Sequence, residues 1–193
     1  MHMTDPSDLR QIRLDKVEKL KELGVNPFPT SFNKTHSVAD ALQQDGKTVA
    51  VAGRVMSFRE HGNIAFADLR DETGKIQIFF QKKLLGDAFK TVLLLDLGDF
   101  IGLEGEVGKT VAGEISVIPT NVTFLSKALR PLPSQWYGLK DTETRYRQRY
   151  LDLLLNPEVR ERFNIRTKVG GGTREYLNNL GFYEVETPAL QPL

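Results

Sequence analysis

Hydrophobic residues change their spacing along this 193-residue chain, and each change marks a new element. Near the N-terminus they recur every three or four residues, which predicts one amphipathic helix that Pro6 opens, Asp5 caps and Gly24 ends. Its apolar stripe consists of Leu9, Ile12, Val17, Leu20 and Leu23. We expect this stripe to pack on a neighbouring core.

From residue 48 the spacing shortens to two, which is typical of half-buried strands. Five strands are predicted, over Thr48–Arg59, Asn63–Arg70, Lys75–Gln81, Asp99–Lys109 and Glu114–Ser126. Between the third and fourth, Lys83–Leu95 is predicted as a helix because Leu84, Ala88, Val92 and Leu95 have helical spacing. Five short strands with one helix after the third indicate a five-stranded OB-fold barrel in a mainly β chain with flanking helices.

After this barrel comes a connector rich in proline, and then a second helical pattern that Asn156 caps and Pro157 opens. Gly170–Gly172 cost this helix roughly 2–3 kcal/mol relative to alanine, so we expect it to be broken or flexible there. Gly181 ends it, and Phe182–Thr187 is predicted as a strand. A helix and a strand without partners indicate the truncated start of an α+β domain.

The chain is accordingly divided into four parts: an N-terminal helix and extended arm (1–47), the barrel (48–126), a linker (127–156) and an incomplete domain (157–193).

Composition removes several classes of function. The chain has no cysteine and three histidines far apart, which excludes disulfides and cysteine nucleophiles and argues against a metal site. No signal peptide or membrane-length apolar run is found, so we expect a cytoplasmic protein without membrane contact. The net charge is +1, but residues 126–168 carry ten basic and five acidic side chains. This is not the uniform basic footprint of a nonspecific DNA-binding protein.

Aromatic residues on the polar face of the strands are the most informative feature. Core-facing positions are aliphatic or aromatic: Ala65, Ala67, Leu69, Ile76, Ile78 and Phe80. Phe66 and Phe79 fall on the opposite face, beside Gln77, where burial alone does not place them. Two such rings resemble a base-stacking platform, worth about 1–3 kcal/mol per base. The alternative is that the N-terminal helix covers them.

Two charged residues accompany this platform. Arg59 ends the first strand next to the turn that leads to Phe66, where it either stacks on a base or remains a solvated charge at the barrel rim. Glu114 points outward with Ser116, because Ile115 and Val117 face the core. A carboxylate there repels phosphate but accepts hydrogen bonds from base amino and imino groups, so it favours selectivity over affinity.

No complete catalytic site is present in the sequence, so the catalytic residues are predicted to be none. The run Gly108-Lys109-Thr110 resembles the end of a phosphate-binding loop, but Leu103 stands where that motif needs glycine.

Several runs resemble class II lysyl-tRNA synthetases of the bacterial type. The linker runs are the most specific: Ala128-Leu-Arg-Pro-Leu-Pro133, Gly138-Leu-Lys-Asp141 and Arg145-Tyr-Arg-Gln-Arg-Tyr-Leu-Asp-Leu153. Upstream, Gly24–Pro29, Gly53-Arg54, Phe66–Asp71 and Ile76-Gln77 are similar to the N-terminal part of these enzymes, and Gly181–Pro188 resembles motif 1 of their catalytic domain.

The resemblance implies that the barrel reads the lysine anticodon of tRNA. It implies that Phe66 stacks on the central uridine, that Arg59 and Gln77 contact or flank this base, and that Glu114 approaches a neighbouring base. Phe79 is a weaker stacking candidate.

For the whole enzyme, the resemblance implies lysine–tRNA ligase activity with ATP and Mg²⁺, and a homodimer whose interface includes Phe182, Glu184 and Pro188. The ATP-binding motifs 2 and 3 lie beyond residue 193, so this chain alone is expected to bind no cofactor and to be inactive. Two alternatives remain open: a standalone OB-fold module that binds single-stranded nucleic acid or protein, and an aspartyl- or asparaginyl-type fragment, against which the linker runs argue.

Overall fold

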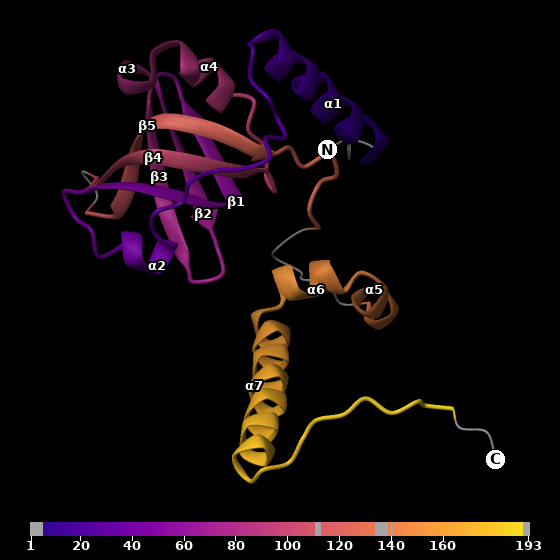
Figure 1. The fold of residues 1–193 in the computed structure, drawn as a ribbon. Coiled ribbons are helices and arrows are strands. Elements are labelled where there is room, and N and C mark those ends of the chain that lie inside the picture. The colour runs from indigo at the N-terminus through magenta and orange to yellow at the C-terminus, as the bar shows by residue number, and fades with distance from the viewer. Residues whose placement is uncertain (1–5, 111–112, 134–138, 140, 191–193) are drawn as a thin grey trace. The chain divides into compact units, whose positions relative to one another are not determined.

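The computed structural model describes residues 6–110, 113–133, 139 and 141–190, and these fall into two compact units (Figure 1). Unit 1 comprises residues 1–132 and unit 2 comprises residues 133–193. Asp5, Gly138 and Lys140, which the sequence analysis named, lie outside the described residues. No helix among the described residues is long and apolar enough to cross a membrane.

Unit 1 is built on a closed barrel in which the strands are ordered β1-β2-β3-β5-β4. The strands are β1 (Thr48–His61), β2 (Ile64–Arg70), β3 (Lys75–Gln81), β4 (Phe100–Lys109) and β5 (Ile115–Ser126). All neighbours are antiparallel except β3 and β5, which pair in parallel at Gln77↔Ser116 and Ile78↔Val117. The predicted five-stranded barrel is therefore confirmed, with the strand ends displaced by two residues at most.

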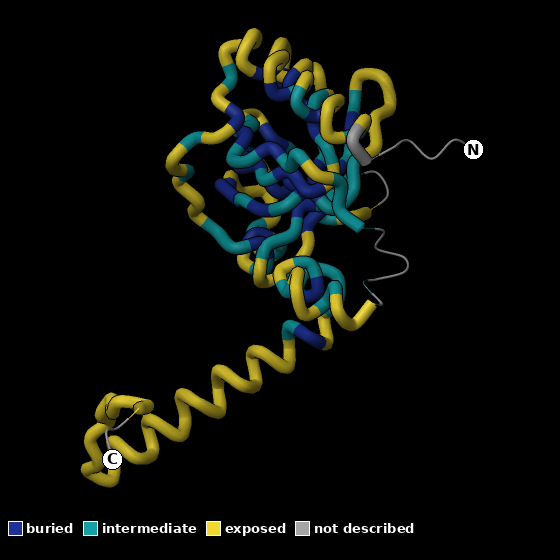
Figure 2. Tube along the Cα trace, turned by 90° about the vertical axis from the view of Figure 1, so that its right-hand side faces the viewer, coloured by how far each residue is buried: buried dark blue, intermediate teal, exposed yellow. Residues whose placement is uncertain are grey.

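Alternation along the strands fills the barrel as expected. The six predicted core residues of β2 and β3 are all buried, and the core continues through valines, leucines and Phe124 of the other strands. Figure 2 shows these buried positions concentrated in the barrel. Burial of this continuous apolar set holds unit 1 together, since burying each large side chain contributes about 1.5–3 kcal/mol.

The segment between β3 and β4 differs from the predicted single helix over Lys83–Leu95. It consists of α3 (Lys82–Leu85), a 3₁₀ turn (Gly86–Ala88) and α4 (Phe89–Val92). Gly86 takes a positive φ of 56°, which an α-helix does not allow, so the helix breaks there. The break also shifts the apolar stripe. Leu84 is exposed, whereas Leu85, Phe89, Val92 and Leu95 are buried.

Helix α1 (Pro6–Glu22) begins and ends close to the expected positions, and Gly24 follows it with φ 75°. Only Val17 and Leu20 of its predicted stripe are buried, while Ile12 and Leu23 are exposed. Arg13 takes the expected place of an apolar residue. Its guanidinium donates to the carbonyl oxygens of Leu97, Ala128 and Arg130 at 2.7–3.3 Å. The helix is therefore attached to unit 1 both by Leu20, which belongs to its hydrophobic core, and by the buried Arg13 guanidinium.

A short helix that the sequence analysis missed, α2 (Val38–Ala41), lies in the arm before β1 and is capped by Ser37. The Asp71 carboxylate accepts from the backbone N–H groups of Val38 at 3.0 Å, Thr73 at 2.7 Å and Gly74 at 3.1 Å. Burial alone would raise the pKa of Asp71, but the Thr73 hydroxyl and these N–H groups lower it to about 2. Asp71 thus joins α2 to the β2–β3 turn.

We expect Asp71→Asn to destabilise the protein by about 1–2 kcal/mol at pH 7, because an amide NH₂ would face the Val38 N–H and the charge would be lost. Since the folded-state pKa lies below the ordinary value, the wild-type contribution is complete above about pH 4 and disappears as the pH falls towards 2. Urea unfolding of both proteins at several pH values tests this. A stability difference that is constant from pH 7 to pH 2 contradicts it.

Unit 2 contains three helices among its described residues: α5 (Thr142–Arg147), α6 (Arg149–Leu155) and α7 (Pro157–Asn179). The expected break at Gly170–Gly172 is wrong, because α7 runs through these glycines without interruption. The i→i−4 hydrogen bonds of a helix need no side chain, and the Thr173 hydroxyl adds a bond to the Val169 carbonyl at 2.9 Å.

Two further expectations for unit 2 are wrong. Phe182–Thr187 forms no strand, because no neighbouring strand among the described residues satisfies its backbone groups. Asn156 stands at the N-cap position of α7, but its side chain does not cap the helix. Instead its amide Nδ2 donates to Asp152 at 2.6 Å.

Candidate nucleic-acid interface

Four of the five residues that the sequence predicts to contact nucleic acid lie on the polar face of β1, β2 and β3, and the fifth, Glu114, directly precedes β5. Register places Phe66 opposite Phe79 and Arg59 opposite Phe66. The Phe66 and Phe79 rings stack with their centroids 4.8 Å apart and their planes within 5°. The sequence predicted two rings on this face but not that they stack on each other. Since the rings face each other, each ring has one remaining flat side on which a planar ligand could stack.

Both rings of this stacked pair remain partly exposed on the outer face of the barrel. The polar contacts of α1 lie elsewhere, with the Arg13 guanidinium on the linker and on Leu97 and the Lys16 ammonium on Asp96. Figure 1 shows α1 beside the barrel. The outer side of the stacked pair is therefore accessible to a planar ligand.

Next to the rings, the Gln77 side chain forms hydrogen bonds both to Glu114, which precedes β5, and to Ser116 of β5. Its amide Nε2 donates to Glu114 Oε2 at 2.7 Å, and its Oε1 accepts from the Ser116 hydroxyl at 2.8 Å. Gln77 is 8% exposed and Ser116 is fully buried, whereas Glu114 is exposed. Ser116 faces the same side as Gln77, as predicted, but it is fully buried, because the parallel pairing of β3 and β5 places Gln77 directly beside it.

Charges of both signs surround this face. Arg59 is exposed and makes no hydrogen bond or ion pair with the described residues. Asp68 lies opposite Gln77 on β2, and its carboxylate is 3.4 Å from the Lys75 ammonium. Arg59 is therefore one charged group of this face that is available to a ligand, and Glu114 keeps a second carboxylate oxygen that Gln77 does not bond.

A shallow hollow of about 390 Å³ lies at the end of β3, two strand positions beyond the stacked rings. It is lined by Asn63, Ile64, Gln81, Lys82 and Lys83. Lys82 and Lys83 were given no functional role from the sequence, and lysine side chains neutralise the phosphates of nucleic acids. The hollow adds positive charge beside the platform.

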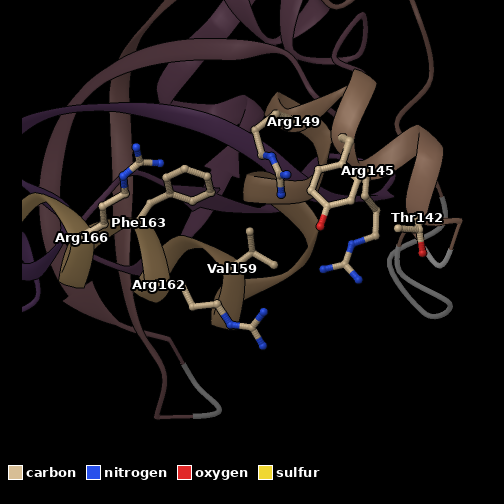
Figure 3. Close-up of a pocket in the computed structure, with 8 residues that line it drawn as sticks. Thr142, Arg145, Arg149, Val159, Arg162, Phe163 and Arg166 are labelled. Atoms are coloured by element: carbon tan, nitrogen blue, oxygen red, sulfur yellow. The ribbon is translucent and has the colours of Figure 1, made fainter.

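Unit 2 has a separate cationic pocket of about 330 Å³. Figure 3 shows the guanidinium groups of Arg145, Arg149, Arg162 and Arg166 around Val159 and Phe163. The Arg149 guanidinium carbon lies 4.8 Å from the centroid of the Tyr146 ring and 5.4 Å from that of Phe163, within the range of cation–π attraction. This is where the basic charge of residues 126–168 collects.

Asp152 anchors the arginines of this pocket. Its buried carboxylate accepts from Arg145 Nε at 2.8 Å and from Arg149. Burial raises the pKa of this carboxyl, but the Asn156 amide and the two guanidinium groups hold it below its usual value. Asp152 therefore stays charged and positions the arginines, and it is not available as a general acid.

The three predicted interface residues of the C-terminal segment do not form a strand edge. Phe182 and Pro188 are exposed, and Glu184 forms a two-pronged ion pair with Arg174 of α7, at 2.6 and 2.9 Å. This pair holds the segment against the end of α7. It lowers the pKa of Glu184 and raises that of Arg174.

Within the described ranges, no group of three or more histidine, aspartate or glutamate side chains is arranged to hold a metal ion.

Two family models match the chain. Residues 49–125 match the OB-fold nucleic acid binding domain, and residues 141–193 match the class II tRNA synthetases of the D, K and N group. The first match covers the barrel with its stacked pair, and the second covers the arginine pocket and α7.

Among curated proteins, similar sequences come from Syntrophomonas wolfei (46% identical over 97% of this chain), Carboxydothermus hydrogenoformans (45% over 100%) and Moorella thermoacetica (42% over 100%), each named lysine–tRNA ligase. The chain spans 39–41% of the length of these relatives. The chain therefore belongs to the class II tRNA synthetases of the D, K and N group, with the barrel as its nucleic acid binding domain and residues 141–193 as part of the synthetase domain.

Proposed function

We propose that this chain recognises the anticodon of lysine tRNA with the outer face of its barrel. One observation carries the proposal: a stacked aromatic pair, partly open to solvent, lies beside a hydrogen-bonded Gln77–Glu114 pair on an OB-fold surface. Flat rings attract any base, whereas the amide and the carboxylate present a defined pattern of donors and acceptors. The relatives named lysine–tRNA ligase favour a lysine anticodon as the ligand.

Within this proposal, the ring of Phe66 stacks on the central uridine, and Phe79 supports that ring from behind or stacks on a second base. Arg59 and Gln77 contact the central base, and Glu114 lies close enough to Gln77 to act on the same base or on a neighbour. Lys82 and Lys83, which the sequence analysis left out, supply charge for the RNA backbone. Phosphate contacts position an RNA, and base contacts select it.

For the whole protein, we propose ATP- and Mg²⁺-dependent ligation of lysine to tRNA in the cytoplasm by a homodimer, with Phe182, Glu184 and Pro188 at the subunit interface. The 193 residues assayed alone are expected to bind RNA without forming lysyl-adenylate, since no complete catalytic site is recognised in their sequence. Lysine-dependent exchange of pyrophosphate into ATP by this chain contradicts that expectation.

Titration with a lysine anticodon stem-loop, and with the same loop carrying cytidine in place of the central uridine, tests anticodon recognition. We expect the uridine loop to bind about 10-fold or more tightly, because one mismatched hydrogen-bonding edge costs on the order of 1–3 kcal/mol. Fluorescence anisotropy at one fixed salt concentration measures both affinities.

The alternatives give different results in the same titration. A standalone OB-fold module binds both loops equally or binds neither, and an aspartyl- or asparaginyl-type domain prefers its own anticodon loop. Either result contradicts the proposal. Stem-loops with aspartate and asparagine anticodons therefore belong in the experiment as competitors.

A further inference from the structure

Ser116 is a buried hydroxyl on β5 that touches the candidate interface without reaching its surface. Its side chain is fully buried, and its hydroxyl donates to Gln77 Oε1 at 2.8 Å. The carbonyl oxygen of Glu114 is a second, more distant acceptor at 3.3 Å. Since a hydroxyl carries one proton, the shorter bond to Gln77 is the one that it makes.

Glu114 determines which way the Gln77 amide faces. A carboxylate only accepts hydrogen bonds, so the group that lies 2.7 Å from Glu114 Oε2 must be the NH₂ of Gln77. The opposite amide orientation would place the amide oxygen against the carboxylate and leave two acceptors in contact. The amide oxygen is therefore turned towards Ser116, whose hydroxyl is there to donate to it.

We propose that Ser116 is a positioning residue, which together with Glu114 locks the Gln77 amide so that it presents an N–H donor to a bound base. The inference rests on the proposed function, because it assigns the source of base selectivity within the same site. Ser116 is buried beneath Gln77 and acts through it without touching the base.

With the Gln77 amide held in this orientation, the site offers one N–H donor and one carboxylate acceptor, which fit uracil better than cytosine. Uracil carries a carbonyl oxygen at position 4 and an N–H at position 3, which complement the Gln77 N–H and the second oxygen of Glu114. Cytosine carries an amino group at position 4 and an unprotonated nitrogen at position 3, so donor faces donor and acceptor faces acceptor. If the amide could turn over, its oxygen would accept from the cytosine amino group, and the selection would weaken.

Ser116→Ala tests this inference with the uridine and cytidine stem-loops. We expect the ratio of their dissociation constants to fall about three- to ten-fold, mainly through tighter binding of the cytidine loop, because one hydrogen bond that holds the amide is lost. Ser116→Thr, which keeps a hydroxyl donor, should restore the ratio. Thr120→Ala is the matched control. Thr120 lies on β5 like Ser116, but its hydroxyl bonds the Glu104 carbonyl of β4 and not Gln77.

The ratio is independent of how much protein is folded, so a merely structural role of Ser116 would not change it. An unchanged ratio in Ser116→Ala at an unchanged melting temperature overturns the inference. If this variant does not fold, Ser116→Cys decides, because a thiol is close to a hydroxyl in size but is only a weak donor to Gln77 Oε1. A reduced ratio in Ser116→Cys then supports the lock, and an unchanged one overturns it. A wild-type protein without uridine preference overturns the proposed function itself and the inference with it.

Discussion

Asp99→Ala is expected to destabilise the protein by about 3–5 kcal/mol, the largest effect of any single substitution considered for this chain. Asp99 is fully buried, and its carboxylate accepts from the Lys127 ammonium at 2.7 Å and from the backbone N–H groups of Asp96 and Ala128 at 2.8 Å each. Alanine would leave the buried ammonium with Asp96 as its remaining carboxylate and both N–H groups without this acceptor. Urea denaturation followed by circular dichroism measures the loss.

Two variants control the Asp99 measurement. Asp87→Ala removes an exposed carboxylate whose ion pair with Lys90 is also exposed, so little change is expected. Asp99→Leu combined with Lys127→Met replaces both buried charges by apolar groups and should recover part of the stability, since no buried ammonium is then left with one of its two carboxylate partners missing. If Asp99→Ala loses less than about 1 kcal/mol, the network does not hold the linker on the barrel as the geometry indicates.

Phe66→Ala is expected to weaken binding of the lysine anticodon stem-loop by about 1–3 kcal/mol, or roughly 5- to 150-fold, if this ring carries a stacked base. The ring stands on the outer face, partly exposed and outside the barrel core, so the cost in folding stability should be much smaller than that of a core truncation. Anisotropy titration of a variant with an unchanged melting temperature separates the two effects.

The matched control for Phe66 is Phe28→Ala, which removes an exposed ring from the N-terminal arm and should leave the affinity unchanged. Phe66→Leu keeps most of the apolar volume but not the flat face, so it should also lose affinity. Binding within twofold of wild type by folded Phe66→Ala would show that the base stacks elsewhere.

Period-two alternation was sufficient to predict the barrel strands, because successive side chains of a strand point to opposite faces and only one face is buried in the core. The same rule placed Phe66, Gln77 and Phe79 on one face before any neighbour was known. It failed at Phe182–Thr187, where the pattern of a strand is present but the pairing partner that makes a strand is not. The prediction of one helix over Lys83–Leu95 was also wrong. Gly86 ends the first helical turn with a positive φ, which the spacing of apolar residues does not reveal.

The sequence by itself therefore determined the fold class and which aromatic side chains face outward. Tertiary structure alone decided how these residues work together, because strand register and parallel pairing join positions that are distant along the chain. The Phe66–Phe79 stack depends on the β2–β3 register, and burial of Ser116 beneath Gln77 depends on the parallel β3–β5 contact across 39 residues. Local periodicity carries no information about either, since both are properties of the closed barrel.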